Sequence, residues 1–274
     1  MPLNPNQVED YMRGFFGYGN PEGRWWFVGP EEGGGRTLDE VCARVQAWHD
    51  AGESVLDLCA YCDHVGHGLQ QWFRENPRPP IQRTWAALIR TVFSAEGRLH
   101  EGLIQQREQI RSYQRVQLGR ADGCTYLSEI LPLPSRGTGH WNYTRADWWE
   151  GGQVPDFVTG NHIRGRNNAL NHCRDARLTY FQQTFNALPP GHRIIIAYGL
   201  PRQYFNIFFA AIGFDINWVP LDGLHAFCLT VHHASQTVIV QTRHPITRGL
   251  RNDYWNAIGA AINELLPPEL NVGE

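Results

Sequence analysis

The sequence predicts an α/β fold, a three-layer α/β/α sandwich built on a central, mostly parallel sheet. Two observations support this prediction. Short apolar runs typical of buried strands occur at Trp25–Val28 and Arg193–Tyr198, and each is followed by a segment whose apolar residues recur at helical spacing. Strands that alternate with helices favour parallel pairing, because the intervening helix carries the chain back across the sheet.

The first strand and the segment after it form the most informative unit. The stretch Gly29–Arg36, which follows Trp25–Val28, is rich in glycine and predicts a tight loop. Thr37 and Glu40 then stand at the spacing of a capping box, and the apolar residues of 38–48 follow at helical spacing. Ligands of open α/β sheets gather where a strand end leads into a helix.

The rest of the chain yields a similar series of elements. A mostly helical region is expected as an insertion around residues 50–120. Further strands are expected at Tyr126–Leu131, Phe214–Val219, Ala226–Val231 and Thr237–Gln241, a loop at Pro132–Trp141, and helices from Tyr204 to Ala211 and from Trp255 to Leu265. No linker or repeat divides the chain, so one domain, residues 1–274, is predicted.

The composition excludes several classes of protein. The chain has 274 residues, of which 42% are hydrophobic and 19% charged, as in globular proteins. All 24 residues counted as Lys+Arg are arginines, which excludes a Walker A lysine, a pyridoxal-phosphate lysine and any lysine Schiff base. The net charge of −3 excludes a uniformly basic nucleic-acid binder, although local basic surfaces remain possible.

The same sequence predicts where the protein works. No apolar run approaches the about 18 residues that a membrane span needs, and the N-terminus lacks the pattern of a secretory signal. The six cysteines fit reduced thiols in a cytoplasm better than a disulfide framework. We therefore expect a monomeric cytoplasmic protein with no membrane partner, no cofactor and no bound metal.

Polar side chains follow three of the predicted strands. Glu31 and Glu32 follow the first strand, Glu129 lies towards the end of the second, and His244 follows the last. The carboxyl ends of parallel strands lie at one edge of a sheet. These side chains are therefore expected to come together.

With these residues in that order, the sequence resembles the uracil-DNA glycosylase superfamily. The segment Gly29–Gly33 is similar to the family's water-activating loop, and Tyr126–Glu129 is similar to its base-reading segment. Arg193–Gly199 is similar to its apolar strand ending in glycine, and His244-Pro245 to its His-Pro-Ser motif. The resemblance implies a uracil-DNA glycosylase-like fold and an enzyme that extrudes a nucleotide from DNA and hydrolyses its glycosidic bond.

The resemblance also implies roles for single residues. Glu31, with Glu32 as the runner-up, would orient or deprotonate the attacking water and stabilise positive charge on the sugar. His244 would donate a hydrogen bond to the departing base, and Leu250 would fill the vacated stack. The candidates for phosphate contacts are Arg136, Arg243, Arg248 and Arg251, and the candidates for stacking on the extruded base are Trp26, Trp141 and Tyr143.

Three residues depart from the family pattern. Pro30 precedes Glu31 where the family places proline after the acidic or amide residue, and Ile246 replaces the serine of the His-Pro-Ser motif. Glu129 stands where uracil-reading members carry asparagine. An ionised glutamate only accepts hydrogen bonds, and cytosine offers a donor at N4, so we expect a cytosine-type or modified base rather than uracil.

The substrate expected from these residues is DNA with a modified or damaged base. We favour a bulky cytosine, hydroxymethylated or glucosylated as in phage DNA, and a defence role in a prokaryotic cell. Without lysine, the enzyme is expected to stop at an abasic site. Repair of uracil or of a damaged base in the host's own DNA stays open.

Two interpretations outside base excision also stay open. Cys59, Cys62, His64 and His67 suggest a metal-dependent hydrolase, although their spacing is tighter than in usual zinc modules. The departures in the catalytic motifs suggest a nucleic-acid-binding relative that has lost the chemistry.

Overall fold

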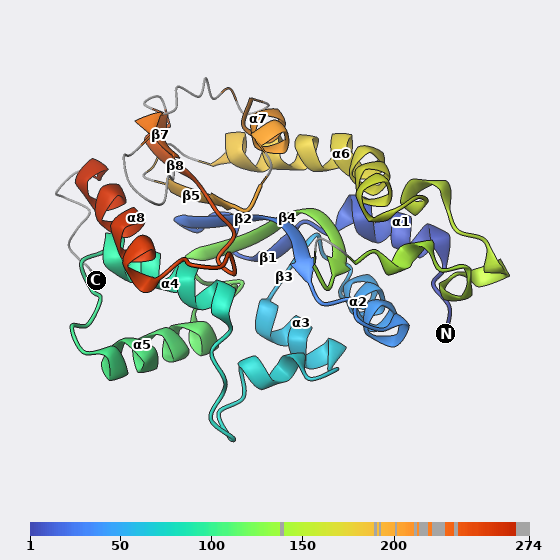
Figure 1. Ribbon diagram of the computed structural model, residues 1–274, viewed down its shortest axis with the longest axis horizontal. Helices are drawn as coiled ribbons and strands as arrows, with labels where there is room; N and C mark the ends of the chain where they lie inside the picture. The colour runs from blue at the N-terminus through green and yellow to red at the C-terminus, as the bar shows by residue number, and fades with distance from the viewer. Residues whose placement is uncertain are drawn as a thin grey trace.

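The protein has an α/β fold in which helices cover both faces of one sheet (Figure 1). The computed structural model describes residues 1–137, 140–188, 191, 193–200, 202–210, 213, 219–220, 228–232 and 235–266. The strands are β1 (Gly17–Gly19), β2 (Trp25–Gly33), β3 (Val55–Leu56), β4 (Thr125–Ser135), β5 (Arg193–Tyr198), β6 (Val219–Pro220), β7 (Cys228–His232) and β8 (Thr237–Thr242). The α-helices are α1 (Pro5–Gly14), α2 (Leu38–Ala51), α3 (Leu58–Val65), α4 (Arg83–Ala95), α5 (Leu103–Val116), α6 (His162–Ala187), α7 (Arg202–Ala210) and α8 (Asn252–Leu265).

The sheet is mixed and mostly parallel, with the order β3-β1-β4-β2-β5-β8-β7-β6. The central strands β4, β2, β5 and β8 all run parallel, and β1 is parallel to β3. The β1–β4, β6–β7 and β7–β8 pairs are antiparallel. The prediction of an α/β fold with a mostly parallel sheet is confirmed, whereas the single domain of residues 1–274 stays a prediction.

Two hydrophobic clusters fill the space between the sheet and its helices. Trp25 and Phe27 of β2 belong to a cluster with Ile258 of α8, and Trp26 belongs to a second cluster with Phe205 of α7. Successive side chains of a strand point to opposite faces, so β2 contributes to both clusters. In Figure 1, α6 and α7 lie on one side of the sheet, and α4, α5 and α8 lie on the other.

Two strands extend further than the sequence predicts. The backbone of β2 continues through the glycine-rich segment, where Glu31 pairs with Leu131 and Gly33 with Ser135 of β4. The predicted loops at Gly29–Arg36 and Pro132–Trp141 are therefore partly strand. Mutual backbone hydrogen bonding outweighs the turn preference of glycine and proline here, because each extension supplies the other with a partner.

Other predicted elements lie partly outside the described residues. The strand expected at Phe214–Val219 is described only where β6 begins, and the strand expected at Ala226–Val231 is described from Cys228 on. The helical region around residues 50–120 contains α3, α4 and α5. The longest helix in the described ranges, α6, has 26 residues. Neither it nor another described helix combines the length and the apolar character needed to cross a membrane.

The start of α2 is capped as the sequence predicts. The Thr37 hydroxyl accepts a hydrogen bond from the backbone N–H of Glu40 at 3.2 Å. The Glu40 carboxylate in turn accepts from the backbone N–H groups of Gly35 at 3.1 Å and Arg36 at 3.0 Å. These bonds satisfy donors that a helix start leaves without partners, so they fix the segment between β2 and α2.

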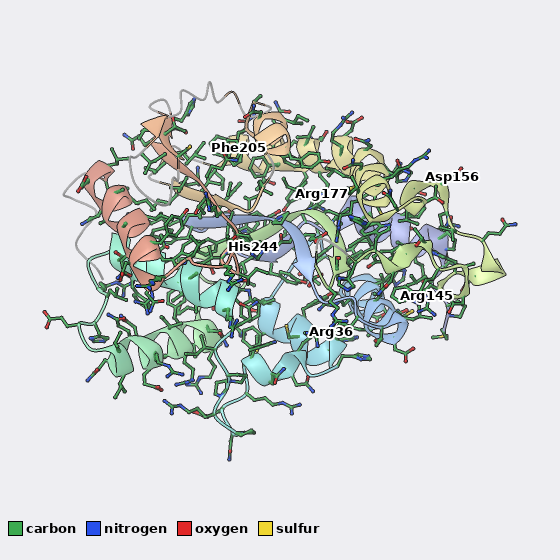
Figure 2. The ribbon with its side chains drawn as sticks, viewed as in Figure 1. Arg36, Arg145, Asp156, Arg177, Phe205 and His244 are labelled. Carbon is green, nitrogen blue, oxygen red and sulfur yellow. The ribbon has the colours of Figure 1, made fainter. Side chains whose placement is uncertain are left out.

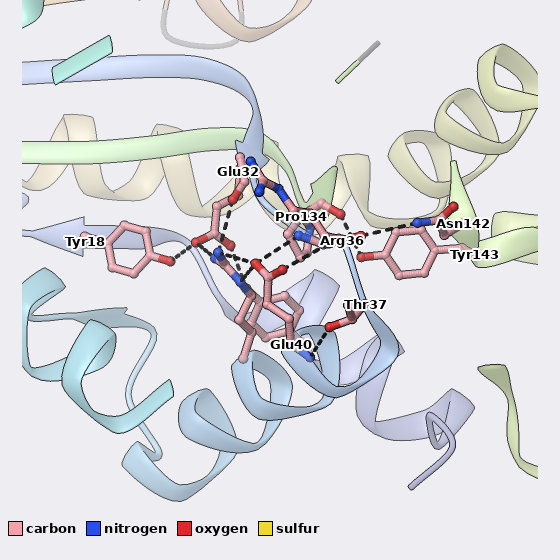
Figure 3. A network of polar contacts seen from close by, with 12 residues as sticks. Tyr18, Glu32, Arg36, Thr37, Glu40, Pro134, Asn142 and Tyr143 are labelled. Atoms are coloured by element: carbon pink, nitrogen blue, oxygen red, sulfur yellow. Dashed lines mark hydrogen bonds and ion pairs between the residues drawn. The ribbon is translucent and has the colours of Figure 1, made fainter. Parts of the chain in front are cut away.

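A buried ion-pair network joins this segment to the end of β2 (Figure 3). Arg44 of α2, whose side chain is 3% exposed, donates to Glu32 and to Glu40, and also to the Gly33 carbonyl at 3.1 Å. Glu32 accepts a further hydrogen bond from the Tyr18 hydroxyl. A buried charge is stable only when it is paired and hydrogen-bonded, and each charge in this network has its partners.

Replacing Arg44 by alanine is expected to lower the free energy of unfolding by about 3–5 kcal/mol, because two buried carboxylates lose their cation. Urea unfolding of the wild type and the variant measures this loss. The matched control is Arg98→Ala, whose ion pair with Glu96 joins a side chain that is 50% exposed. The control is expected to lose at most about 1 kcal/mol. Equal losses in the two variants would contradict a stabilising role for the network.

Candidate active site at the carboxyl edge of the sheet

The carboxyl ends of four adjacent parallel strands form one edge of the sheet. In the order β4-β2-β5-β8, β2 lies between β4 and β5, the two parallel strands that follow it along the chain. These two strands therefore pair with opposite sides of β2. Ligands of open α/β sheets bind in the crevice at such a point. The structure places Glu31, Glu129 and His244 along this edge, on β2, on β4 and directly after β8.

Glu129 is a buried carboxyl group held across Gly29 of the neighbouring strand. The Tyr198 hydroxyl donates to Glu129 Oε1 at 3.0 Å, and Oε2 is buried without a hydrogen-bond partner in the described part of the chain. A Cβ on residue 29 would lie 2.5 Å from the Tyr198 hydroxyl and would also overlap Glu129 Oε2, so this approach requires glycine. Burial raises the pKa of Glu129 well above its usual range. The protonated form, which both donates and accepts hydrogen bonds, is therefore favoured.

His244, labelled in Figure 2, is held as a neutral imidazole. Its Nδ1 accepts a hydrogen bond from the backbone N–H of Ile246 at 3.2 Å, which assigns the proton of the neutral ring to Nε2. Burial lowers the pKa of His244, so the neutral form dominates at pH 7. The ring stands edge-on to Tyr198, with centroids 5.5 Å apart. His244 therefore carries an Nε2–H donor next to the Glu129–Tyr198 pair.

Gly199 allows the close approach of His244 to the end of β5. A Cβ on residue 199 would lie 2.8 Å from His244 Cβ and 2.9 Å from its Cδ2. Residue 199 also has a φ of +65°, a conformation that favours glycine. This glycine, expected from the sequence as the end of an apolar strand, thus makes room for the histidine.

Glu31 is paired with Arg166 of α6. Arg166 Nε donates to Glu31 Oε2 at 2.7 Å and Nη2 donates to Oε1 at 3.2 Å. Arg166 also donates to the Ser135 hydroxyl at 2.7 Å and to the Gly137 carbonyl at 2.6 Å. Burial raises the pKa of Glu31, and the guanidinium opposes that rise. A carboxylate offers about four lone-pair positions, so Glu31 can still accept a hydrogen bond from a water.

Glu32, the second carboxylate considered for catalysis, belongs to the buried network instead. Its side chain bonds to Arg44 and Tyr18, and it accepts from the Tyr11 hydroxyl at 3.4 Å. Glu32 thus accepts from three protein donors on two sides, whereas the two hydrogen bonds to Glu31 both come from Arg166. Of the two glutamates, the geometry therefore favours Glu31 as the group that meets a water.

A hollow of about 470 Å³ lies beside His244. Its lining residues are Gly199, Leu200, Cys228, Gln241, Thr242, Arg243, His244 and Thr247. The volume falls within the range of about 300–1,000 Å³ typical of small-molecule sites. These residues come from the ends of β5 and β8 and the start of β7, whereas Glu31 and Glu129 lie on β2 and β4. The structure thus brings His244, but neither carboxylate, into the wall of the hollow.

The aromatic side chains expected to stack on an extruded base lie in the core. Trp26 is fully buried, with its ring 5.5 Å from that of Phe181. Trp141 and Tyr143 are also buried, and their polar atoms donate to backbone carbonyls at 2.9 Å and 3.0 Å. The prediction of a stacking platform is corrected for these three residues: apolar packing and satisfied hydrogen bonds give them structural roles.

The residues expected to contact DNA are exposed, with one exception. Arg136, Arg243, Arg248 and Arg251 are exposed, and none forms an ion pair with another described residue. Leu250 is only half-buried and packs against the larger hydrophobic cluster. The exposed apolar side chain of this loop is instead Ile246, at 66%. Ile246 is thus more exposed than Leu250, and the role of Leu250 as a wedge stays a prediction.

The cysteines and histidines of α3 do not gather around a common point. Cys62 is buried and Cys59 is half-buried, while His64 lies 3.4 Å from the Asp50 carboxylate. Among the described residues, no three His, Cys, Asp or Glu side chains form a group that could hold a metal ion. This finding does not favour the metal-dependent hydrolase.

Two residues of the site have no clear signal in the sequence. Arg166 contacts Glu31 across 135 residues of chain, a separation that no local spacing pattern reveals. Tyr198 is the last residue of an apolar strand, and its sequence position indicates only burial. Both are found because the fold brings α6 and β5 to the end of β2.

Replacing Glu129 by glutamine is expected to change how stability depends on pH. The folded pKa of Glu129 is raised above the unfolded value of about 4.3, so wild-type stability falls as the pH rises from that value through the folded pKa. Glutamine does not ionise. Urea unfolding between pH 4 and pH 8 should therefore show the wild type losing stability relative to Glu129→Gln as the pH rises. A stability difference independent of pH would contradict a buried, protonated Glu129.

Comparison with known proteins adds no assignment. The sequence matches no protein-family model, and no curated protein is significantly similar to it. The resemblance to the uracil-DNA glycosylase superfamily therefore depends on the short motifs alone, and the chemistry of the site must support any proposed function.

Proposed function

We propose that the protein is a monofunctional DNA glycosylase that hydrolyses the glycosidic bond of an extruded, modified pyrimidine. The observation that carries the proposal is the state of His244, a neutral imidazole with an Nε2–H donor beside a hollow of ligand size. The uracil-DNA glycosylase-like fold is part of the proposal. It is supported by the position of the four motif segments, which fall on or directly after four adjacent parallel strands.

The first step of the proposed reaction is departure of the base. The bond between the sugar C1′ and the base nitrogen breaks, and its electron pair leaves with the base. His244 Nε2–H donates a hydrogen bond to the base oxygen on which the negative charge develops. The neutral ring can perform this role because its one N–H lies on Nε2. The lowered pKa of His244 keeps the ring in this neutral form at pH 7.

The second step is capture of the sugar by water. The sugar carries oxocarbenium character, and the Glu31 carboxylate stabilises that positive charge while it orients a water for attack at C1′. As the C1′–O bond forms, Glu31 takes the proton that the water loses, and the departed base anion is protonated in turn. The two hydrogen bonds from Arg166 fix the direction of this carboxylate. The chain contains no lysine to form a Schiff base with the sugar, so the product is an abasic site.

The protonated carboxyl of Glu129 changes the expected base recognition. An ionised glutamate would select the N4 donor of cytosine, whereas a carboxylic acid pairs with any edge that offers one acceptor and one donor. Cytosine offers N3 and N4–H, and uracil offers O4 and N3–H. The hollow beside His244 is of ligand size, although Glu129 does not line it. The substrate that we propose is a hydroxymethylated or glucosylated cytosine, consistent with defence against phages.

A second candidate function is favoured by one observation. Both glutamates of the catalytic motif carry an ion pair, Glu31 with Arg166 and Glu32 with Arg44. Such pairing suits a DNA-binding relative that retains the fold without the chemistry. In that case the protein binds DNA and releases no base.

Base release from duplex oligonucleotides distinguishes the two functions. The oligonucleotides carry uracil, cytosine, 5-hydroxymethylcytosine or its glucosylated form, and alkali-labile sites report excision. The wild type is expected to release a modified cytosine, and His244→Ala to lower the rate by about 10²–10³-fold through loss of the hydrogen-bond donor. Glu31→Gln is expected to lower the rate by at least about 10²-fold.

The matched controls are His100→Ala and Glu53→Gln, two exposed positions outside the site. Both are expected to retain the wild-type rate, and thermal unfolding confirms that every variant is folded. If the protein binds DNA but releases no base from any substrate, the glycosylase function is rejected and the DNA-binding function is supported. Release of uracil alone would retain the enzyme and reject the modified cytosine.

A further inference from the structure

The exposed arginines of the protein fall into two groups. Away from the carboxyl edge, four exposed arginines pair with a nearby carboxylate, as Arg13 does with Glu9. Three others, Arg74, Arg83 and Arg107, form no ion pair with a described residue. At the carboxyl edge, six exposed arginines form no ion pair with any described residue. These six are Arg36, Arg136, Arg164, Arg243, Arg248 and Arg251.

Three of these arginines belong to the loop after β8. Arg243, Arg248 and Arg251 surround Ile246, and we call these four residues the site arm. The loop is held by hydrogen bonds from Ile246 N–H to His244 Nδ1 and from Thr247 N–H to the His244 carbonyl, at 3.2 Å and 2.8 Å.

The other three arginines lie after β2, after β4 and in the first turn of α6. Together with Ile163, which is 61% exposed, we call Arg36, Arg136 and Arg164 the α6 arm. Both arms thus combine one exposed isoleucine with arginines that have no ion-pair partner in the described ranges, a pattern that suits contact with the phosphates and sugars of a nucleic acid.

Short contacts hold the segments of the α6 arm together. Arg166 joins α6 to β2 through Glu31 and to the end of β4 through the Gly137 carbonyl, at 2.6 Å. The Asn142 side chain donates to the Gly35 carbonyl at 3.4 Å, which joins the segment after β4 to the loop that carries Arg36. The three arginines therefore come from two loops and a helix start that are joined by hydrogen bonds.

Three of these arginines lie at the starts of helices, and the placement of Arg164 is unfavourable without an anion. Arg36 precedes α2, Arg164 lies in the first turn of α6, and Arg251 is the N-cap of α8. The start of a helix is its positive end, where a cation is destabilising. The first turns of α2 and α8 contain acidic residues, whereas the first turn of α6 contains none, so the cost falls on Arg164. A polyanion at this edge would remove that cost, and it would also offset the repulsion among the arginines.

We propose that the DNA backbone crosses the carboxyl edge from the site arm to the α6 arm, so that Arg36 and Arg164 bind phosphates beyond the candidate active site. This inference rests on the proposed function for the identity of the ligand. The strands β2 and β8 are two strand spacings apart across the sheet, about 10 Å, and β2 continues four residues beyond the level at which β8 ends.

The test is the salt dependence of binding to an unmodified, fluorescein-labelled 24-base-pair duplex, measured by fluorescence anisotropy. The variant is Arg36→Ala/Arg164→Ala, and its matched control is Arg74→Ala/Arg107→Ala. The control also removes two exposed arginines that form no ion pair with a described residue, from the helical region around α5. Both double variants change the net charge equally.

The arm variant is expected to bind more weakly than the wild type, with a salt slope smaller by about 1.8, or 0.9 for each of two lost phosphate contacts. Its affinity deficit should therefore shrink about tenfold between 50 and 200 mM salt. The control is expected to match the wild type. Equal effects in the two double variants, or none in either, would overturn the proposed path.

The outcome is separable from that of the proposed function, because the duplex carries no excisable base. If the protein releases no base but Arg36→Ala/Arg164→Ala weakens DNA binding and the control does not, the proposed DNA path is supported and the glycosylase is rejected. Base release by a protein whose DNA affinity does not depend on Arg36 and Arg164 retains the glycosylase and rejects this path.

Discussion

The buried ion pair between Arg44 and Glu32 fixes the geometry on which the rest of the site depends. The ion pair joins the end of β2 to α2, and the hydrogen bond from Arg44 to the Gly33 carbonyl sets the direction in which the chain leaves the strand. Glu31, the residue before Glu32, is thereby directed towards α6, where Arg166 receives it. The two adjacent glutamates thus have different environments, because Glu32 is paired with Arg44 of α2 and Glu31 with Arg166 of α6.

The local patterns of the sequence predict the fold well. The apolar runs at Trp25–Val28 and Arg193–Tyr198 and the capping residues Thr37 and Glu40 depend on neighbours in sequence, so the strands and the start of α2 are readable from it. The lengths of β2 and β4 are not readable, because glycine and proline indicate turns unless a partner strand supplies hydrogen bonds. Pairing of Gly33 with Ser135 supplies them.

The site is predicted less completely, for a physical reason. Strand topology brings Glu31, Glu129 and His244 to one edge, and their positions after predicted strands indicate this. Burial, however, depends on the whole fold: it turns Trp26 and Trp141 into core residues, and it favours the protonated form of Glu129. The contact of Glu31 with Arg166 and the exposure of Ile246 likewise arise only when distant segments pack. Residue types thus indicate the chemistry, and burial decides which of them can perform it.

The central claim is that DNA binds at the carboxyl edge of the parallel strands, and hydrogen exchange tests it most directly. Amide exchange is measured by mass spectrometry with and without a duplex that contains a tetrahydrofuran abasic-site analogue. We expect slower exchange at 29–37, 160–166 and 243–251 in the complex, and no change in α5. Protection confined to α5 or to the packed faces of α4 and α8, with the carboxyl edge unchanged, would contradict it.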